Sequence, residues 1–219
     1  MTQTEQEELT GTHRRIAATY FMTLDGVVQD PQNWSFPYWN DESQKFKEAE
    51  LEKTGALLLG RTTYEAFAAS WPPRKGTDWF ATTFNTIPKY VVSNNLKKAE
   101  WENSKIITGD VESEIRKLTS TGHGDLVVHG SVTLTNWLVK HDLLDELRIL
   151  LYPLTLGKGM RLLEDQSKTS LRLVMSKPFT SGVVSLVYKR TKDETPQRAS
   201  QVEYAEAVKR TREVARKKS

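Results

Sequence analysis

The sequence predicts an α/β protein in which one mixed sheet has helices on both faces. Short apolar runs typical of buried strands alternate with helix-forming segments as far as residue 140. This alternation is the pattern of parallel strands joined by crossover helices. After Asp142, three strand-like segments follow one another with no convincing helix between them, so we expect the sheet to end in an antiparallel section.

The strands are predicted from apolar and β-branched runs, most of them bounded by turn or capping residues. The first covers residues 14–22 and leads into Thr23-Leu24-Asp25-Gly26, which has turn chemistry shaped by Asp25. The later strands are expected at Ala56–Gly60, Lys89–Ser93, Lys105–Thr108, Asp125–His129, Glu146–Tyr152, Ser170–Ser176 and Val183–Lys189. Asp145 and Glu146 are expected to begin their strand at the surface.

Helices are predicted where Glu, Lys, Gln and Ala accumulate or where a capping residue precedes a helical pattern. The expected starts are Asn40 or Asp41, Thr62 with Glu65 at capping-box spacing, Asp110, and Gly130-Ser131. The first, third and fourth of these helices run to about residues 53, 119 and 140.

Length and composition indicate one globular domain with appended ends. The 219 residues are 37% hydrophobic and 27% charged. We expect a flexible N-terminus over residues 1–13, a domain over 14–190 and a charged tail, helical or disordered, over 191–219. No apolar run approaches the ~20 residues of a bilayer span, the start is polar and acidic, and cysteine is absent. These features predict a cytoplasmic protein with no membrane partner.

The net charge of +3 is confined to the tail. Residues 191–219 hold eight Lys or Arg and five Asp or Glu, so the rest of the chain is formally neutral. Because so small a charge neutralises few phosphates, nucleic acid is an unlikely partner.

Two strand–glycine–helix junctions carry the chemical signal. They are Gly60-Arg61-Thr62-Thr63 and His129-Gly130-Ser131. Helix N-termini bind phosphates through free N–H groups, and glycine allows close approach. Each junction alone is more often plain architecture, but together they indicate a dinucleotide. The first strand lacks the G-x-G-x-x-G of a Rossmann fold, and no metal site is predicted.

Seven motifs occur in an order that resembles a known family. They are Met22–Gly26, Trp34–Glu42, Leu59–Glu65, Lys89–Ser93, Val128–Ser131, Leu143–Leu147 and Tyr152–Leu163. In this order they resemble stand-alone dihydrofolate-reductase-like proteins, which are related to the reductase domain of the bifunctional riboflavin-biosynthesis deaminase/reductase. The resemblance covers residues 14–190 and implies a three-layer α/β/α fold with a central, mostly parallel mixed sheet and an antiparallel C-terminal section.

The resemblance also implies an NADPH site and a homodimer. Gly60, Arg61, Thr62 and Thr63 would hold phosphates, and Ser93 and Asn94 would lie near the adenosine 2′-phosphate. His129, Gly130, Ser131 and Val132 would follow the pyrophosphate and the nicotinamide side, with Ala18 and Val27 beside the nicotinamide ring. A buried structural role for His129, satisfied by backbone, is an equal alternative.

The substrates of these relatives cannot be assigned to this chain from the resemblance. Val128 stands where the riboflavin reductase domain has a substrate-contacting glutamate, and its Asp-Asp-Pro stretch with a following arginine is absent. Folate reductases carry one buried carboxylate on the first helix, for which Asp41 or Glu42 is the nearest candidate by position.

An aromatic-rich segment is the candidate substrate wall, because flat rings suit a flat heterocycle. Its members are Trp34, Phe36, Tyr38 and Trp39. Asp41 and Glu42 are the acids within it, and desolvation would raise the pKa of such an acid and make it a proton donor. For one of the two, an exposed carboxylate favoured by the helix dipole is at least as good an interpretation.

The sequence therefore leaves two candidate functions. The first is an NADPH-dependent reductase of a small heterocycle, resembling 5-amino-6-(5-phosphoribosylamino)uracil reductase and dihydrofolate reductase. The second is a non-catalytic NADP-binding or regulatory protein that retains the fold.

Overall fold

An eight-stranded mixed sheet forms the centre of the computed structural model, which describes residues 13–163 and 169–191. The strand order is β4-β3-β2-β5-β1-β6-β8-β7. The bounds are β1 Ile16–Thr23, β2 Thr54–Gly60, β3 Lys89–Val92, β4 Ser104–Ile107, β5 Asp125–His129, β6 Glu146–Tyr152, β7 Leu171–Pro178 and β8 Val184–Arg190. The pairs from β4 to β6 are parallel and the pairs of β8 with β6 and β7 are antiparallel, which confirms the predicted mixed sheet.

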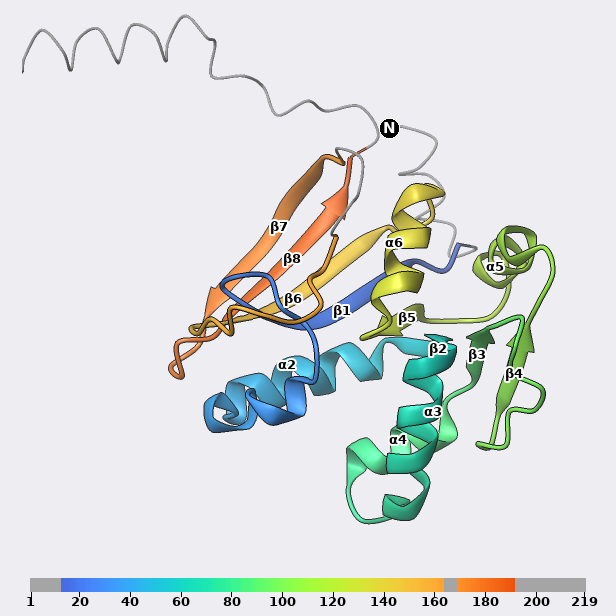
Figure 1. Cartoon of the computed structure of the whole chain (residues 1–219), viewed down its shortest axis with the longest axis horizontal. Coiled ribbons are helices and arrows are strands. Elements are labelled where there is room, and N and C mark those ends of the chain that lie inside the picture. The colour runs from blue at the N-terminus through green and yellow to red at the C-terminus, as the bar shows by residue number, and fades with distance from the viewer. Residues whose placement is uncertain (1–12, 164–168, 192–219) are drawn as a thin grey trace, which may run out of the picture.

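Helices cover both faces of this sheet, as the alternation predicts (Figure 1). On one side lie α2 (Asp41–Glu52), α3 (Arg61–Ser70) and α4 (Trp79–Thr86), and on the other α5 (Val111–Thr119) and α6 (Val132–Lys140). Short 3₁₀ turns occur at Pro31–Asn33, Phe36–Tyr38 and Pro72–Arg74. None of the helices in the described residues has the length and apolar character needed to cross a membrane.

Side-chain caps start three of the helices. Asn40 accepts from the Ser43 amide at 3.0 Å and Asp110 from the Ser113 amide at 3.1 Å, as predicted. Asp78 accepts from the Ala81 amide at 2.7 Å and begins α4, a helix that the sequence analysis did not predict. The predicted capping box of Thr62 and Glu65 is wrong, since α3 begins at Arg61 and its N-cap residue is Gly60, which has no side chain to cap it.

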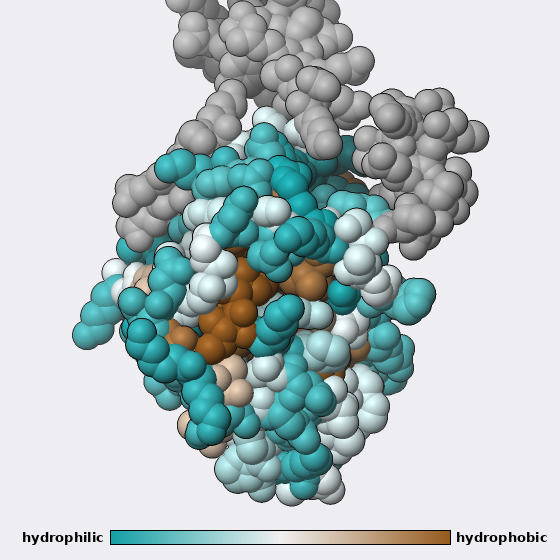
Figure 2. Space-filling view, turned by 90° about the vertical axis from the view of Figure 1, so that its right-hand side faces the viewer, coloured by the Kyte–Doolittle hydropathy of each residue, from teal (hydrophilic) through white to brown (hydrophobic). Residues whose placement is uncertain are grey.

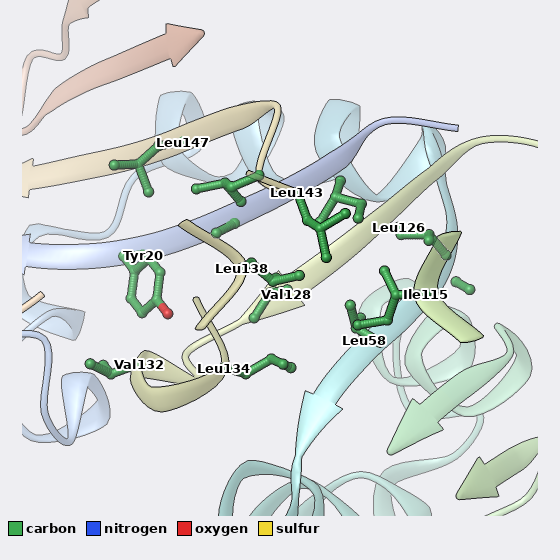
Figure 3. Packing of buried hydrophobic residues seen from close by; sticks show 14 of the residues in the cluster. Tyr20, Leu58, Ile115, Leu126, Val128, Val132, Leu134, Leu138, Leu143 and Leu147 are labelled. Carbon is green, nitrogen blue, oxygen red and sulfur yellow. The ribbon is translucent and has the colours of Figure 1, made fainter. Parts of the chain in front are cut away.

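Alternate strand residues fill the core on the α5 and α6 side. Figure 3 shows Leu58, Leu126 and Val128 of β2 and β5 packed beside the apolar side chains of these two helices. Tyr20 is buried in the same cluster, and its hydroxyl lies 2.7 Å from the Thr135 hydroxyl of α6. This hydrogen bond fixes α6 over β1, so the start of α6 has a defined place at the edge of the sheet.

The face of the sheet opposite α5 and α6 contains buried charged residues. Glu146 was predicted at the surface, but it is only 7% exposed, which corrects that expectation. Its carboxylate accepts from Arg148 Nε at 2.6 Å, so an ion pair replaces the lost hydration. The N-terminal segment up to residue 12 and the tail from residue 192 lie outside the described residues.

Candidate cofactor and active site

The two predicted junctions meet in one open cavity of about 440 Å³. It lies where β2 and β5 end and where α3 and α6 begin. Seven of the residues predicted to bind a cofactor line it, namely Gly60, Arg61, Thr62, Thr63, Gly130, Ser131 and Val132. Val92, Val111, Leu134, Trp137 and Met160 give it a largely apolar wall, completed by Thr133.

The hydroxyl of Ser131 ties the two junctions together. It accepts from the Gly60 amide at 2.8 Å and donates to the Thr63 hydroxyl at 2.8 Å. Ser131 is itself buried. The loops that follow β2 and β5 are therefore held at a fixed spacing without any ligand.

The helix starts at this cavity differ from the others. Side chains cap α2, α4 and α5, whereas neither α3 nor α6 has a side-chain cap. Their first-turn amides are thus left for another acceptor, which is the usual arrangement of a phosphate site. Gly130 has a φ of +68°, and a Cβ built on it would meet nothing within 4 Å, so open space lies beside this backbone.

Arg61 stands at the exposed rim of the cavity. Its guanidinium bonds both carboxylate oxygens of Glu65 at 3.1 and 3.2 Å, and the two side chains are each 47% exposed. A surface pair of this kind is weak. Arg61 is therefore available to an anion that enters the cavity.

Trp137 is a site residue that sequence reasoning missed. It lines the cavity from α6, and its ring stacks on the imidazole of His141 with centroids 3.9 Å apart. The signal in the sequence was its place one turn after Thr133, on a helix already assigned to the junction. Figure 2 shows the side of the molecule that lies to the right in Figure 1, and hydrophobic residues gather there among hydrophilic ones.

The remaining predicted cofactor residues do not line this cavity. Ala18 and Val27 are buried at 0% and 1% exposure. Ser93 and Asn94 follow Val92 at the end of β3, where the Ser93 hydroxyl accepts from the Asn95 and Leu96 amides. His129 is buried, with its ring against Phe67 and Phe84, on the face of the sheet opposite Val128.

Three of the four predicted substrate-wall rings pack against the ends of β1 and β6. Trp34 is buried, and it meets Tyr152 edge-on at 5.2 Å between centroids, with Tyr38 doing the same at 5.9 Å. Trp39 lies 6.0 Å from Phe21. Phe36 is 66% exposed. Much of this segment thus stabilises the fold, and parts of Tyr38 and Trp39 face outward.

The two candidate acids begin α2 near the surface. Asp41 is exposed, and Glu42 accepts from both the amide and the hydroxyl of Thr180 at 2.7 Å. The amide bond first, and then the hydroxyl bond, lower the pKa of Glu42. The rise in pKa expected from shielding by aromatic rings is therefore wrong for Glu42.

The buried carboxylate of α2 is instead Glu50, which is 5% exposed. It pairs with Lys47 on the same helix and faces His129 and Arg148 of the sheet. Burial by itself raises the pKa of Glu50, but the surrounding charges, with Lys47 first, and the Lys47 hydrogen bond together outweigh burial, so the net pKa is lowered. Burial, with help from the Lys47 charge, lowers the pKa of His129 to about 3, so the imidazole is neutral.

No group of three or more acidic or histidine side chains is placed to hold a metal ion within residues 13–163 and 169–191.

The fold defines an α/β protein whose open cavity lies at the carboxyl ends of parallel strands, which is where sheets of this kind usually bind ligands. Comparison with known families then gives the assignment. The chain belongs to the family of RibD C-terminal domains, which matches residues 14–185. The family resemblance read from the sequence is thereby confirmed.

Individual relatives agree with this assignment. A curated relative, the uncharacterized protein YyaP of Bacillus subtilis (strain 168), is 27% identical over 183 residues, which is 80% of this chain and 94% of the relative. A putative riboflavin biosynthesis protein from Shewanella sp. PV-4 has a similar structure, with a TM-score of 0.67, 23% identity and coverage of 81% of this chain and 99% of that one.

A dihydrofolate reductase from Enterococcus faecalis, solved with NADP(H), matches with a TM-score of 0.56 and 18% identity over 81% of this chain and 96% of that one. The dihydrofolate-reductase-like fold is therefore confirmed.

Proposed function

We propose that this protein is an NADPH-dependent reductase of a small heterocyclic molecule. The observation that carries the proposal is the cavity where two uncapped helix starts, joined through Ser131, face an apolar wall. A dinucleotide needs both parts, because its phosphates are anionic and its two bases are flat and largely apolar. The similarity to a reductase solved with NADP(H) supports the same reading.

The residues of the cavity fit this cofactor in a definite orientation. The amides of Gly60–Thr63 and Gly130–Val132 would bind phosphate oxygens, with the Arg61 guanidinium adding a charge-assisted bond. The Trp137 ring, backed on one face by His141, offers its cavity side to the adenine. Ser93 and Asn94 then lie beyond Val92, where the adenosine 2′-phosphate is proposed.

NADPH supplies a hydride when bound, and the protein must place the substrate carbon and deliver a proton. In the proposal the outward parts of Tyr38 and Trp39 contact the substrate ring, and Ala18 and Val27 lie behind the nicotinamide. Asp41 is the better proton donor of the two acids, because Glu42 is committed to Thr180 as an ionised acceptor.

A substrate screen tests the proposal directly. NADPH oxidation by the full chain would be followed with dihydrofolate, with 5-amino-6-(5-phosphoribosylamino)uracil and with a panel of small carbonyl compounds. Turnover of one of them, lost when Gly130 is replaced by Val, is the expected result. Failure to bind NADPH in calorimetry would overturn the proposal.

The non-catalytic alternative predicts a different outcome of the same screen. Tight NADPH binding without turnover of any compound would favour a binding or regulatory protein. The homodimer implied by the family resemblance stays a prediction, and light scattering during gel filtration measures it.

A further inference from the structure

A cluster of buried polar side chains lies between α2 and the sheet, next to the cofactor cavity. Thr19, His129 and Arg148 occupy neighbouring register positions on β1, β5 and β6, with Thr19 in the centre. Lys47 and Glu50 complete the cluster from α2, which packs over these strands. Each of these five residues is at most 7% exposed, so water from bulk solvent does not reach most of their polar atoms.

Direct bonds satisfy only part of this cluster. Lys47 donates to Glu50 and, at 3.1 Å, to the Thr19 hydroxyl. Arg148 donates from Nη2 to Asp125 at 2.6 Å and from Nε to Glu146 at 2.6 Å. These bonds hold the Arg148 guanidinium and the Glu50 carboxylate in fixed positions.

Three atoms remain buried without a partner, and all three belong to the Glu50 carboxylate or lie about it. They are Glu50 Oε2, Arg148 Nη1 and His129 Nε2. Arg148 Nη1 lies 3.9 Å from Glu50 Oε2, and His129 Nε2 lies 4.0 Å from Glu50 Oε1. These separations are too long for a hydrogen bond, yet one small molecule can bond both atoms of each pair. Buried polar atoms are nearly always bonded, so three unpaired atoms about one carboxylate indicate that they share a partner in a small gap beside it.

We propose that one ordered water molecule occupies this gap and bridges Glu50, His129 and Arg148. The chemistry of the three atoms selects water. Arg148 only donates, the Glu50 carboxylate only accepts, and the neutral His129 nitrogen does either according to its tautomer. An anion would meet the Glu50 carboxylate, and a cation would meet Arg148 and Lys47. Water accepts from Arg148, donates to Glu50 and makes its third bond to His129, which is the usual number for a buried water.

The position of this water has a structural consequence. His129 ends β5, and the next residue, Gly130, enters the cofactor cavity. Glu50 belongs to α2, which begins with the candidate acids Asp41 and Glu42. The water therefore connects the helix on the substrate side to the strand that carries the phosphate junction. This inference does not depend on the reductase proposal, because it concerns the protein without ligands.

Two measurements test it on the full-length protein. A crystal structure at about 1.5 Å should show a water within hydrogen-bond distance of all three atoms. Oxygen-17 relaxation dispersion in solution counts long-lived internal waters and should lose one in the His129→Phe variant. A phenyl ring keeps the contacts with Phe67 and Phe84, removes the nitrogen and extends further into the gap.

His141→Phe is the matched control, because it makes the same exchange on a histidine remote from this cluster, and its water count should equal the parent's. An empty gap in the crystal, or a direct Arg148–Glu50 bond that closes it, would overturn the proposal. An unchanged internal-water count in His129→Phe would do the same, whether or not that variant binds NADPH.

Discussion

Loss of the Arg61 guanidinium is expected to weaken NADPH binding while leaving the fold intact. A hydrogen bond to a charged group contributes about 1.5 to 3 kcal/mol. In the free protein Arg61 is bonded to Glu65, a half-exposed i,i+4 pair, and giving up such a pair costs about 0.3 to 0.5 kcal/mol. The net loss in Arg61→Ala is therefore about 1 to 2.5 kcal/mol, or roughly 5- to 70-fold in Kd.

Calorimetric titration of the parent, Arg61→Ala and Glu65→Ala with NADPH and with NADH measures this effect. Glu65→Ala is the matched control, since it frees Arg61 from its competitor and should raise affinity by roughly twofold. If Arg61→Ala loses affinity for NADPH alone, Arg61 lies at the 2′-phosphate. If it loses affinity equally for NADPH and NADH, Arg61 lies at the pyrophosphate. If Arg61→Ala binds NADPH as tightly as the parent, the junction at Gly60–Thr63 is architecture and the cofactor placement must be withdrawn.

Four further predictions follow from other parts of the structure. Asp41→Asn should lower kcat by about 10²- to 10⁴-fold with NADPH affinity unchanged, whereas Glu42→Gln should leave proton transfer intact, because Glu42 is an ionised acceptor from Thr180. An unchanged stopped-flow rate in Asp41→Asn would leave water as the donor. Trp137→Leu should weaken NADPH binding by roughly two- to tenfold, since an aromatic pair contributes about 0.5 to 1.5 kcal/mol; fluorescence titration checks this, and equal affinity would remove the ring from the adenine site. Burial lowers the pKa of Lys89 to about 8 from 10.5. The unfolded chain thus binds more protons between these values, so the free energy of unfolding should rise by about 3 kcal/mol as pH rises through this window. Urea unfolding should show no such rise in Lys89→Met, and parallel curves for both proteins would contradict the assignment. A chain ending at Lys192 should fold, because β8 ends at Arg190; a missing thermal transition in circular dichroism would show that the tail is needed.

The strands and the two strand–glycine–helix junctions could be predicted because their signals are local. An apolar run followed by glycine and a capping pattern needs no knowledge of distant residues, and the starts at Asn40 and Asp110 were predicted this way. The start of α4 was not predicted because Trp79–Thr86 contains three threonines, which favour helices poorly.

The buried charges could not be predicted, because their burial depends on residues that are distant in the chain. Glu146 and Arg148 alternate with apolar residues, which is also the pattern of a strand with one face in water. Asp125, which pairs with Arg148, is more than 20 residues away in the chain, and this ion pair forms only when β5, β1 and β6 assemble. The same long-range assembly gives Glu50, and not Asp41 or Glu42, the buried position on α2.

The place of β1 in the sheet bears on how the chain is made. β1 comes first among the strands of the described sheet but lies in its centre. Its neighbours β5 and β6 begin much later in the chain, at Asp125 and Glu146. Until those strands are synthesised, the apolar residues of β1 have no partner in the sheet. Pairing of β1 in the sheet must therefore wait until β5 and β6 have been synthesised. Contacts so distant in sequence form slowly, and until they form the segment Ile16–Thr23 is exposed to aggregation.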